Sequence, residues 1–152
     1  MDELNFRKVS EEEFNAGDFL CVFSPNENAR CFAFLSLNEV CFKLSWESDL
    51  LEPVIVHVKD SIYAIGIDLH FSLIDFKDCR IVKKFDLDFF LVDIEVVAGY
   101  LIIITELSAI KIYIDENYIK DFIAFPDTYV EHAIKEGVIE IQCSDNESLL
   151  IK

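Results

Sequence analysis

A 38-residue repeat constrains the fold of this chain more than any other feature. Three segments that read as strand, short turn and strand begin at Val54, Val92 and Val130, so their starts are evenly spaced. Apolar residues match between the three segments. A fixed period of this size is typical of repeat architectures, in which each repeat is one small structural unit. The sequence therefore predicts similar units in succession over residues 53–152.

Each repeat is expected to be an antiparallel meander. Turns are expected at 59–61, 97–99 and 135–137. Third strands are expected at 71–76, 109–114 and 147–152, in the same 38-residue register, and fourth strands at 79–85 and 118–125. The third repeat has three such strands. These units resemble propeller blades in their period, although the sequence motifs of the common propeller families are absent.

The most apolar stretch, Val96–Asp115, tests this interpretation. A membrane helix needs about 20 apolar residues, and Thr105, Glu106 and Lys111 interrupt this stretch. Its residues are mainly β-branched and aromatic, which favours strands over a buried helix. Residues 108–115 alternate apolar and polar with the period of a strand, and residues 100–105 are apolar on both faces, as in a central strand covered from both sides.

The N-terminal part follows a looser pattern. Strands are expected at 17–24, 30–36 and 38–46, and Ser10 with Glu13 indicates a capped helical turn within residues 1–14. We therefore expect a single all-β domain over residues 1–152, with N-terminal strands in 1–52 and repeated strand units in 53–152. The fold class is an antiparallel meander with blade-like repeats, arranged as an open curved sheet or as a β-sandwich.

The charge of the chain is strongly acidic. It has 29 Asp and Glu residues against 13 Lys and Arg residues, a formal net charge of -16. Such a surface repels nucleic acid and anionic membranes and attracts basic partners, although charge also keeps an apolar chain soluble. The five cysteines form no CxxC pair, and the first residues lack the apolar segment of a secretory signal. Free thiols and a cytoplasmic location are expected.

No motif for catalysis is visible. The three histidines, His57, His70 and His132, form no HExxH or HxH pattern, and the sequence has no nucleophile elbow, dinucleotide fingerprint or phosphate-binding loop. We therefore expect a protein that is not an enzyme and that has no metal and no cofactor.

Paired carboxylates mark the strongest candidate for a binding face. Asp93 and Glu95 lie two residues apart on a predicted strand, so they share a face, and we expect this face to point into solvent. A solvated strand face without a ligand is the simpler explanation of the pair, and a protein-binding face is the alternative. The residues predicted to bind a partner, with Tyr113 as an aromatic centre, are Asp86, Asp88, Asp93, Glu95, Glu106, Tyr113, Asp115 and Glu116.

Small size, acidity, strand content and the lack of a catalytic motif together resemble bacterial immunity proteins of contact-dependent inhibition and polymorphic toxin systems. The resemblance covers the whole chain as a profile, and no single motif carries it. It implies a cytosolic protein that binds one cognate toxin domain, often a basic nuclease, and blocks it. The alternative is a non-enzymatic structural or regulatory β-repeat module, which pairs with another chain through the edge of its three-stranded repeat. The sequence leaves the oligomeric state open.

Overall fold

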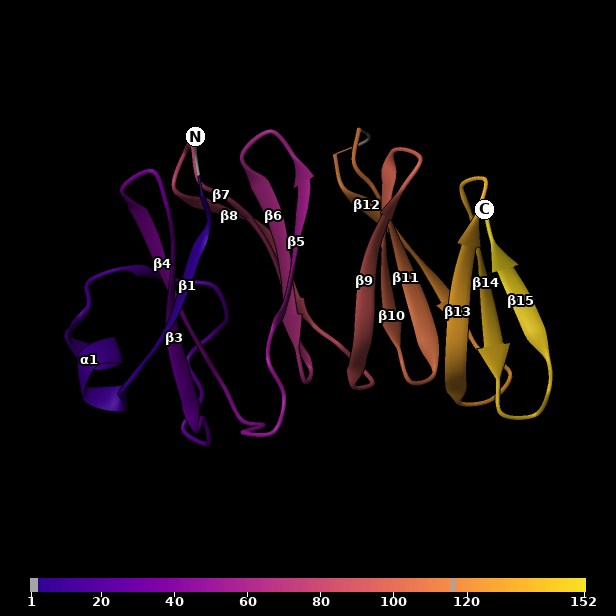
Figure 1. Ribbon diagram of the computed structural model, residues 1–152, viewed down its shortest axis with the longest axis horizontal. Coiled ribbons are helices and arrows are strands. Elements are labelled where there is room, and N and C mark those ends of the chain that lie inside the picture. Colours follow the sequence, from indigo (N-terminus) through magenta and orange to yellow (C-terminus); the bar gives the residue numbers. More distant parts are fainter. Residues whose placement is uncertain (1–2, 116) are drawn as a thin grey trace. The chain divides into compact units, whose positions relative to one another are not determined.

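The computed structural model describes residues 3–115 and 117–152, and strands dominate it (Figure 1). Of the described residues, 59% lie in strands and 4% in a helix. The strands form four separate sheets, which we call A to D in chain order. This confirms the predicted all-β class with blade-like repeats. The chain divides into two compact units, residues 1–87 and 88–152, and the boundary falls between two of the predicted repeats.

Sheet A contains the N-terminal strands in the order β1-β3-β4-β2. Its strands are β1 (Asn5–Val9), β2 (Leu20–Cys21), β3 (Cys31–Leu37) and β4 (Val40–Trp46). Helix α1 (Glu11–Ala16) follows β1, and the Ser10 side chain accepts a hydrogen bond from the Glu13 amide at 3.1 Å. The predicted helix cap is therefore confirmed. Strand β1 was not predicted from the sequence.

The strand predicted at residues 17–24 was largely wrong. Only Leu20–Cys21 pairs with a neighbour, and it does so parallel to β4. Val22 and Phe23 are both buried, whereas consecutive residues of a regular strand point to opposite faces. The chain therefore leaves the ladder after the Val22 amide, which donates to the carbonyl of Lys43 at 2.8 Å, and both side chains enter the core.

Sheet B is the first repeat and completes unit 1. Its strands are β5 (Val54–Lys59), β6 (Ile62–Ile67), β7 (His70–Asp75) and β8 (Arg80–Asp86), each paired with the next in the chain. Sheets A and B share one apolar core, in which Trp46 and Phe42 are the largest fully buried side chains. Ile65 and Ile67 supply the sheet B side of this core.

The end of strand β7 provides a pH-dependent contribution to stability. Burial alone would raise the pKa of Asp75, but hydrogen bonds from the Ser61 hydroxyl and from backbone amides, together with the charge of Arg80, hold this pKa below its usual value. A group with a lowered folded pKa stabilises the fold above its unfolded pKa of about 3.9, and that contribution is lost as the pH falls through the folded value.

The replacement Asp75→Asn is therefore expected to destabilise the chain at pH 7 and to have a smaller effect near pH 3. Urea unfolding of both proteins at the two pH values measures the difference. Asp88→Asn, at an exposed position, is the control and should change little at either pH. An Asp75→Asn penalty that stays the same across this pH range would contradict the argument.

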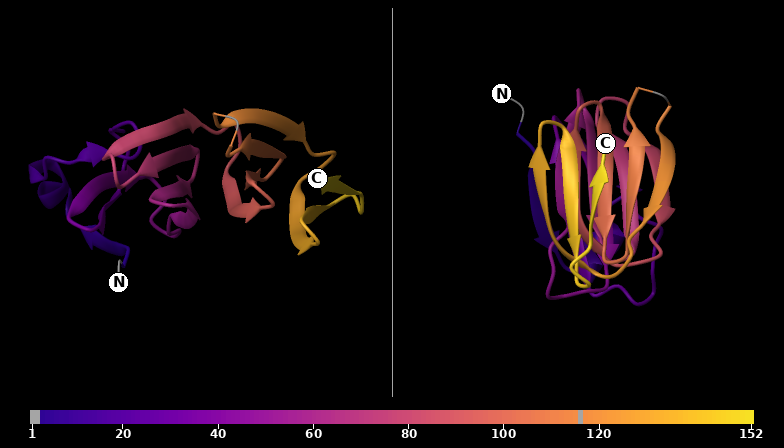
Figure 2. Two further views of the ribbon diagram at one scale, coloured as in Figure 1. Left: turned by 90° about the horizontal axis from the view of Figure 1, so that it is seen from above. Right: turned by 90° about the vertical axis from the view of Figure 1, so that its right-hand side faces the viewer.

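Unit 2 contains sheets C and D, which lie as adjacent layers (Figure 2). Sheet C is formed by β9 (Leu91–Val97), β10 (Tyr100–Thr105), β11 (Ser108–Tyr113) and β12 (Ile119–Ala124). Sheet D is formed by β13 (Tyr129–Lys135), β14 (Val138–Cys143) and β15 (Ser148–Ile151). All residues of β10 are buried, as predicted for a central strand. Ile102 and Ile104 of sheet C pack against Ile139 and Ile141 of sheet D.

The hairpin turns confirm the 38-residue repeat. Strands β6, β10 and β14 begin at Ile62, Tyr100 and Val138, which are spaced by the predicted period. Each follows a two-residue turn that begins with a positive φ, 48° at Asp60, 48° at Ala98 and 51° at Glu136. Tight hairpin turns require this left-handed backbone, and glycine provides it at the second turn position in Gly99 and Gly137, with φ values of 87° and 79°.

The register of the repeat changes in the last hairpin of sheet D. Ile103 pairs with Ile110 in sheet C, whereas its equivalent in sheet D, Ile141, pairs with Leu149. The spacing between Ile110 and Leu149 exceeds the predicted period by one position. The longer turn at 144–147 accommodates the extra residue.

The cysteines are free thiols, as expected from the sequence. Cys143 is buried, Cys79 is exposed, and Cys21, Cys31 and Cys41 are half-buried. Burial is the main factor that raises the pKa of Cys31 and of Cys41, which keeps both thiols protonated at neutral pH and lowers their reactivity. Among the described residues, no helix has the length and apolar character to span a membrane.

Candidate functional site

The acidic residues predicted to bind a partner are spread over several elements. Asp86 is exposed at the end of β8 in unit 1, and Asp88 is exposed at the start of unit 2. Glu106 is exposed in the turn between β10 and β11, and Asp115 is exposed after β11. Glu116 lies outside the described residues.

Within unit 2 these residues fall at opposite ends of sheet C. The Glu106 amide donates to the carbonyl of Phe90 at 3.1 Å, which places Glu106 beside the start of β9. Tyr113 instead pairs with Tyr100, at the end where β9 finishes. A strand of six residues spans roughly 20 Å. Glu106 and Tyr113 are therefore too far apart to lie in one small patch.

Tyr113 is already engaged inside unit 2. The Lys111 ammonium lies 4.1 Å from the centre of the Tyr100 ring and 4.9 Å from that of Tyr113. It also donates to the carbonyl of Lys152. The sequence alternation places Lys111 on a polar face, but sheet D covers that face and Lys111 is buried. Tyr113 therefore helps to hold a buried cation.

Asp93 and Glu95 share a face, as predicted, but they do not point freely into solvent. Both side chains approach His132 of β13 in sheet D. The Nε2 atom of His132 is 3.2 Å from a Glu95 carboxylate oxygen and 3.8 Å from one of Asp93. The His132 side chain is 13% exposed, against 40% for Asp93 and 27% for Glu95. Together they form a polar cluster at the edge of the core between sheets C and D.

Tyr129 completes this cluster from the start of β13. Its hydroxyl lies 2.8 Å from Nδ1 of His132, so both ring nitrogens of the imidazole have polar neighbours. Burial raises the pKa of the Tyr129 phenol, and the carboxylates of Asp93, Glu131 and Glu95 add to this effect. The phenol is therefore neutral at neutral pH and available as a hydrogen-bond partner. The imidazole is fixed with Nε2 directed at the two carboxylates.

The sequence interpretation did not connect His132 with the carboxylates. His132 and Glu95 are almost one repeat apart in the chain, and both lie on the first strand of their sheets. In stacked repeats the back of one sheet meets the front of the next, so residues of opposite alternation phase become neighbours. This stacking rule, applied to the 38-residue period, is the signal by which the sequence could have paired them.

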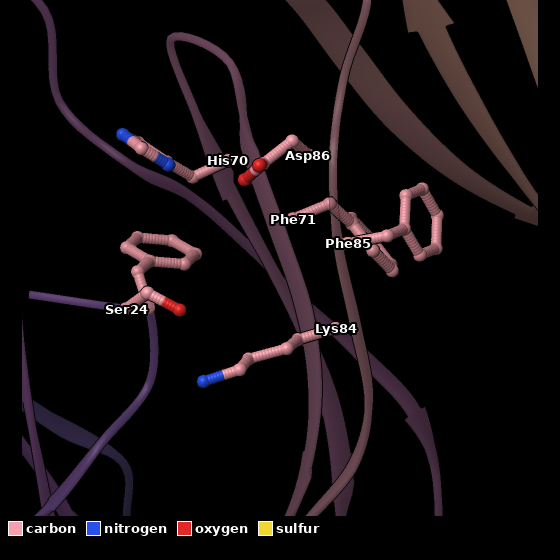
Figure 3. Close-up of a pocket in the computed structure, with 7 residues that line it drawn as sticks. Ser24, His70, Phe71, Lys84, Phe85 and Asp86 are labelled. Carbon is pink, nitrogen blue, oxygen red and sulfur yellow. The ribbon is translucent and has the colours of Figure 1, made fainter.

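A second candidate site lies in unit 1 (Figure 3). A pocket of about 210 Å³ lies among Ser24, His70, Lys84 and Asp86, with phenylalanine rings beside them. His70, Lys84 and Asp86 project from one side of the sheet and Phe71 and Phe85 from the other (Figure 3). The pocket combines a cation and a carboxylate, so it suits a small polar group and shows no preference for a strongly charged ligand.

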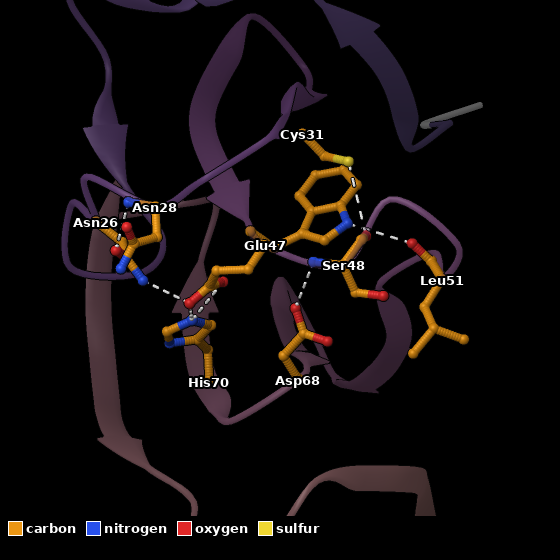
Figure 4. A network of polar contacts seen from close by, with 9 residues as sticks. Asn26, Asn28, Cys31, Glu47, Ser48, Leu51, Asp68 and His70 are labelled. Carbon is orange, nitrogen blue, oxygen red and sulfur yellow. Dashed lines mark hydrogen bonds and ion pairs between the residues drawn. The ribbon is translucent and has the colours of Figure 1, made fainter.

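Neighbouring polar contacts favour a structural role for His70 (Figure 4). Its Nε2 atom lies 3.0 Å from both carboxylate oxygens of Glu47, and its ring stacks on Phe23 with centres 5.2 Å apart. Nearby, the Ser48 amide donates to Asp68 and the Trp46 indole donates to the carbonyl of Leu51. These contacts fix the link between sheets A and B.

A scan against family models and a search of curated proteins find no match for this chain. Among solved structures, the N-terminal domain of Nup159 is similar, with a TM-score of 0.51, 10% identity and 97% of this chain covered. Hsv2 of Kluyvelomyces marxianus is similar over 78% of this chain, with a TM-score of 0.44 and 10% identity. The chain spans 46% of the length of each. The similarity to the Nup159 domain is one of fold.

Proposed function

We propose that this protein is a non-enzymatic binding protein that uses an acidic face of sheet D to hold a basic surface of another protein. The outer face of sheet D is the one that points away from sheet C. Strand pairing and the burial of the alternate residues place on it Glu131, Ala133, Lys135, Val138, Glu140, Gln142, Ser148 and Leu150, so it has two carboxylates and one lysine.

The charge distribution of unit 2 supports this proposal. Among its described residues, nine carboxylates and only three lysines are exposed. The carboxylates are those of Asp88, Glu106, Asp115, Asp121, Glu131, Glu136, Glu140, Asp145 and Glu147, and the lysines are Lys120, Lys135 and Lys152. A surface with this excess attracts a basic protein from a distance and accelerates its association.

A comparison of the repeats identifies the outer face of sheet D as the binding surface that we propose. Ile102 and Ile104 of sheet C are buried where they pack on sheet D. The residues one repeat later, Glu140 and Gln142, are polar, and Glu140 is exposed. Leu150, paired with Glu140, is 54% exposed and offers an apolar contact beside the charge. An interface needs both, because charge steers association while apolar contacts prolong the complex.

A toxin domain is the specific partner that the resemblance to immunity proteins suggests. The cleft of a nuclease is positively charged because it holds phosphates. A rigid acidic sheet face is complementary to such a cleft and blocks it without any chemistry of its own. In this form of the proposal the protein is an immunity protein, and its partner is encoded by the neighbouring gene.

Charge reversal tests the proposal. The double replacement of Glu131 and Glu140 by lysine is expected to slow association with the domain encoded by the neighbouring gene by about tenfold or more in 0.1 M salt. In 1 M salt the effect should largely disappear, because the Debye length falls from about 10 Å to about 3 Å. Stopped-flow or surface-based binding kinetics measure both rates.

The matched control replaces Glu12 and Glu27, two exposed acids of unit 1, by lysine, which changes the net charge equally. Its association rate should fall much less. Equal losses for both variants would mean that net charge rather than this face governs binding. The absence of any complex with the neighbouring gene product would overturn the immunity proposal.

An interaction module that binds by strand addition is the second candidate. Sheet D has three strands where sheets B and C have four, and β15 pairs only with β14 among the described strands. An edge of this kind accepts a strand from another protein through backbone hydrogen bonds. A complex that is insensitive to salt and to both double variants would favour this candidate.

A further inference from the structure

We infer that Asp93, Glu95 and His132 form a binding site for a divalent transition-metal ion, with Zn²⁺ as the best match. One imidazole nitrogen and two carboxylate oxygens, one from each residue, all lie within 4.8 Å of one another. Strand β9 supplies the two carboxylates and β13 supplies the imidazole. This inference departs from the expectation of no metal, which rested on the absence of local sequence motifs.

The distances are close to those of a ligated ion. Zinc bonds of about 2.0–2.1 Å in a tetrahedral arrangement place ligand atoms roughly 3.3 Å apart. The separation of 3.2 Å between His132 Nε2 and Glu95 already matches this value, and that of 3.8 Å to Asp93 is slightly longer. The Asp93 side chain is 40% exposed and has room to adjust. The two carboxylate oxygens lie within 4.8 Å of each other, so side-chain rotation must bring them closer to about 3.3 Å to close the site around an ion.

The charges and protons of the cluster also suit a dication. A neutral imidazole carries a single N–H, and when that proton is on Nδ1 it donates to the Tyr129 hydroxyl 2.8 Å away. Nε2 then directs a lone pair toward the two carboxylates. Two negative charges and a lone pair converge on one point, and an ion of charge +2 balances them. Metal-binding histidines commonly have such a partner on the second nitrogen.

The ligand types select the metal. Mg²⁺ and Ca²⁺ prefer sites made wholly of oxygen atoms, whereas imidazole favours zinc and its transition-metal neighbours. Three protein ligands leave a fourth tetrahedral position for water or for a group from a bound partner. The ion would also join sheets C and D, because its ligands come from both. Metal binding is therefore expected to raise the thermal stability of the chain.

Calorimetric titration of the full chain, freed of metal with a chelator and kept reduced, tests the inference with Zn²⁺ as the probe. One saturable equivalent is expected, with a rise in melting temperature. Glu95→Gln and His132→Asn should weaken binding more than Tyr129→Phe, for which a loss of about 10–100-fold is expected because the imidazole loses its hydrogen-bond partner. Glu136→Gln, at an exposed position in the turn after β13, is the control and should bind Zn²⁺ as the unmodified chain does.

Two further measurements keep the test decisive. Cobalt substitution distinguishes these ligands from the free cysteines, because a thiolate-to-cobalt charge-transfer band would place the metal on sulfur and overturn the inference. If His132→Asn fails to fold, Asp93→Asn carries the test, since its side chain is the most exposed of the three. The absence of saturable Zn²⁺ binding, or isotherms unchanged in Asp93→Asn and Glu95→Gln, would also overturn it.

Discussion

Replacement of Trp46 by alanine is expected to lower the free energy of unfolding by about 3–5 kcal/mol. Trp46 is fully buried in the core of unit 1, where its ring lies 6.3 Å from that of Phe6. Its indole nitrogen donates to the carbonyl of Leu51 at 3.2 Å. Alanine would leave a large cavity and an acceptor without its donor. Since domains are stable by only about 5–15 kcal/mol, this loss would bring the chain close to unfolding.

Guanidinium unfolding followed by circular dichroism measures the effect. Leu50→Ala is a suitable control because Leu50, in the link after Trp46, is 92% exposed. Its effect should stay within about 0.5 kcal/mol, as is usual for surface positions. Similar midpoints for the two variants would mean that the packing of Trp46 contributes little to the stability of the chain.

Replacement of Lys111 by glutamate is expected to cost about 3 kcal/mol or more, because it buries a carboxylate without a partner. The Lys111 ammonium lies against the faces of Tyr100 and Tyr113, which carry partial negative charge. Lys111→Met keeps the length of the side chain and removes the charge. The Lys111→Met variant loses a cation–π contribution of about 0.5–2 kcal/mol, but it avoids the cost of burying an ammonium group. Its net effect should be much smaller.

A larger loss of stability for Lys111→Glu than for Lys111→Met would show that the sign of the buried charge causes the loss. Urea unfolding of both variants, with Lys135→Glu at an exposed position of β13 as the control, gives the comparison. Lys135→Glu should change stability by no more than about 0.5 kcal/mol. Equal losses for Lys111→Met and Lys111→Glu would show that packing of the side-chain stem, rather than the charge, is what matters.

The repeated strands were predictable because their signals are local. Strict alternation, two-residue turns and matched apolar positions define β6, β10 and β14 within short windows of sequence. The Ser10 cap was predictable for the same reason. The conformation of residues 17–24 was not predictable. Val22 and Phe23 enter the core through tertiary packing, which overrides the alternation of a strand. The one-residue register change before Leu149 depends on a longer turn, for which the apolar pattern gave no signal.

The candidate site was the least predictable part. Asp93 and Glu95 were recognised as a pair on one face, but the pattern of one strand does not indicate which sheet covers that face. Lys111 was placed on a polar face for the same reason. Both errors come from stacking, in which a strand can be covered on each side and polar residues at the edge of a core find partners there. The packing of sheet D on sheet C is what brings His132 to the two carboxylates.

The front-to-back packing of sheet D on sheet C also bears on self-association. An interface that joins two different faces is heterologous, and repeating it adds subunits in an open series rather than closing a dimer. An apolar outer face on sheet D would allow one copy of the chain to stack on the next and so to grow into a filament. Glu140 and Gln142, where sheet C has Ile102 and Ile104, make this face polar, and a polar face opposes such stacking. Isoleucine at both positions is expected to make the chain prone to polymerise.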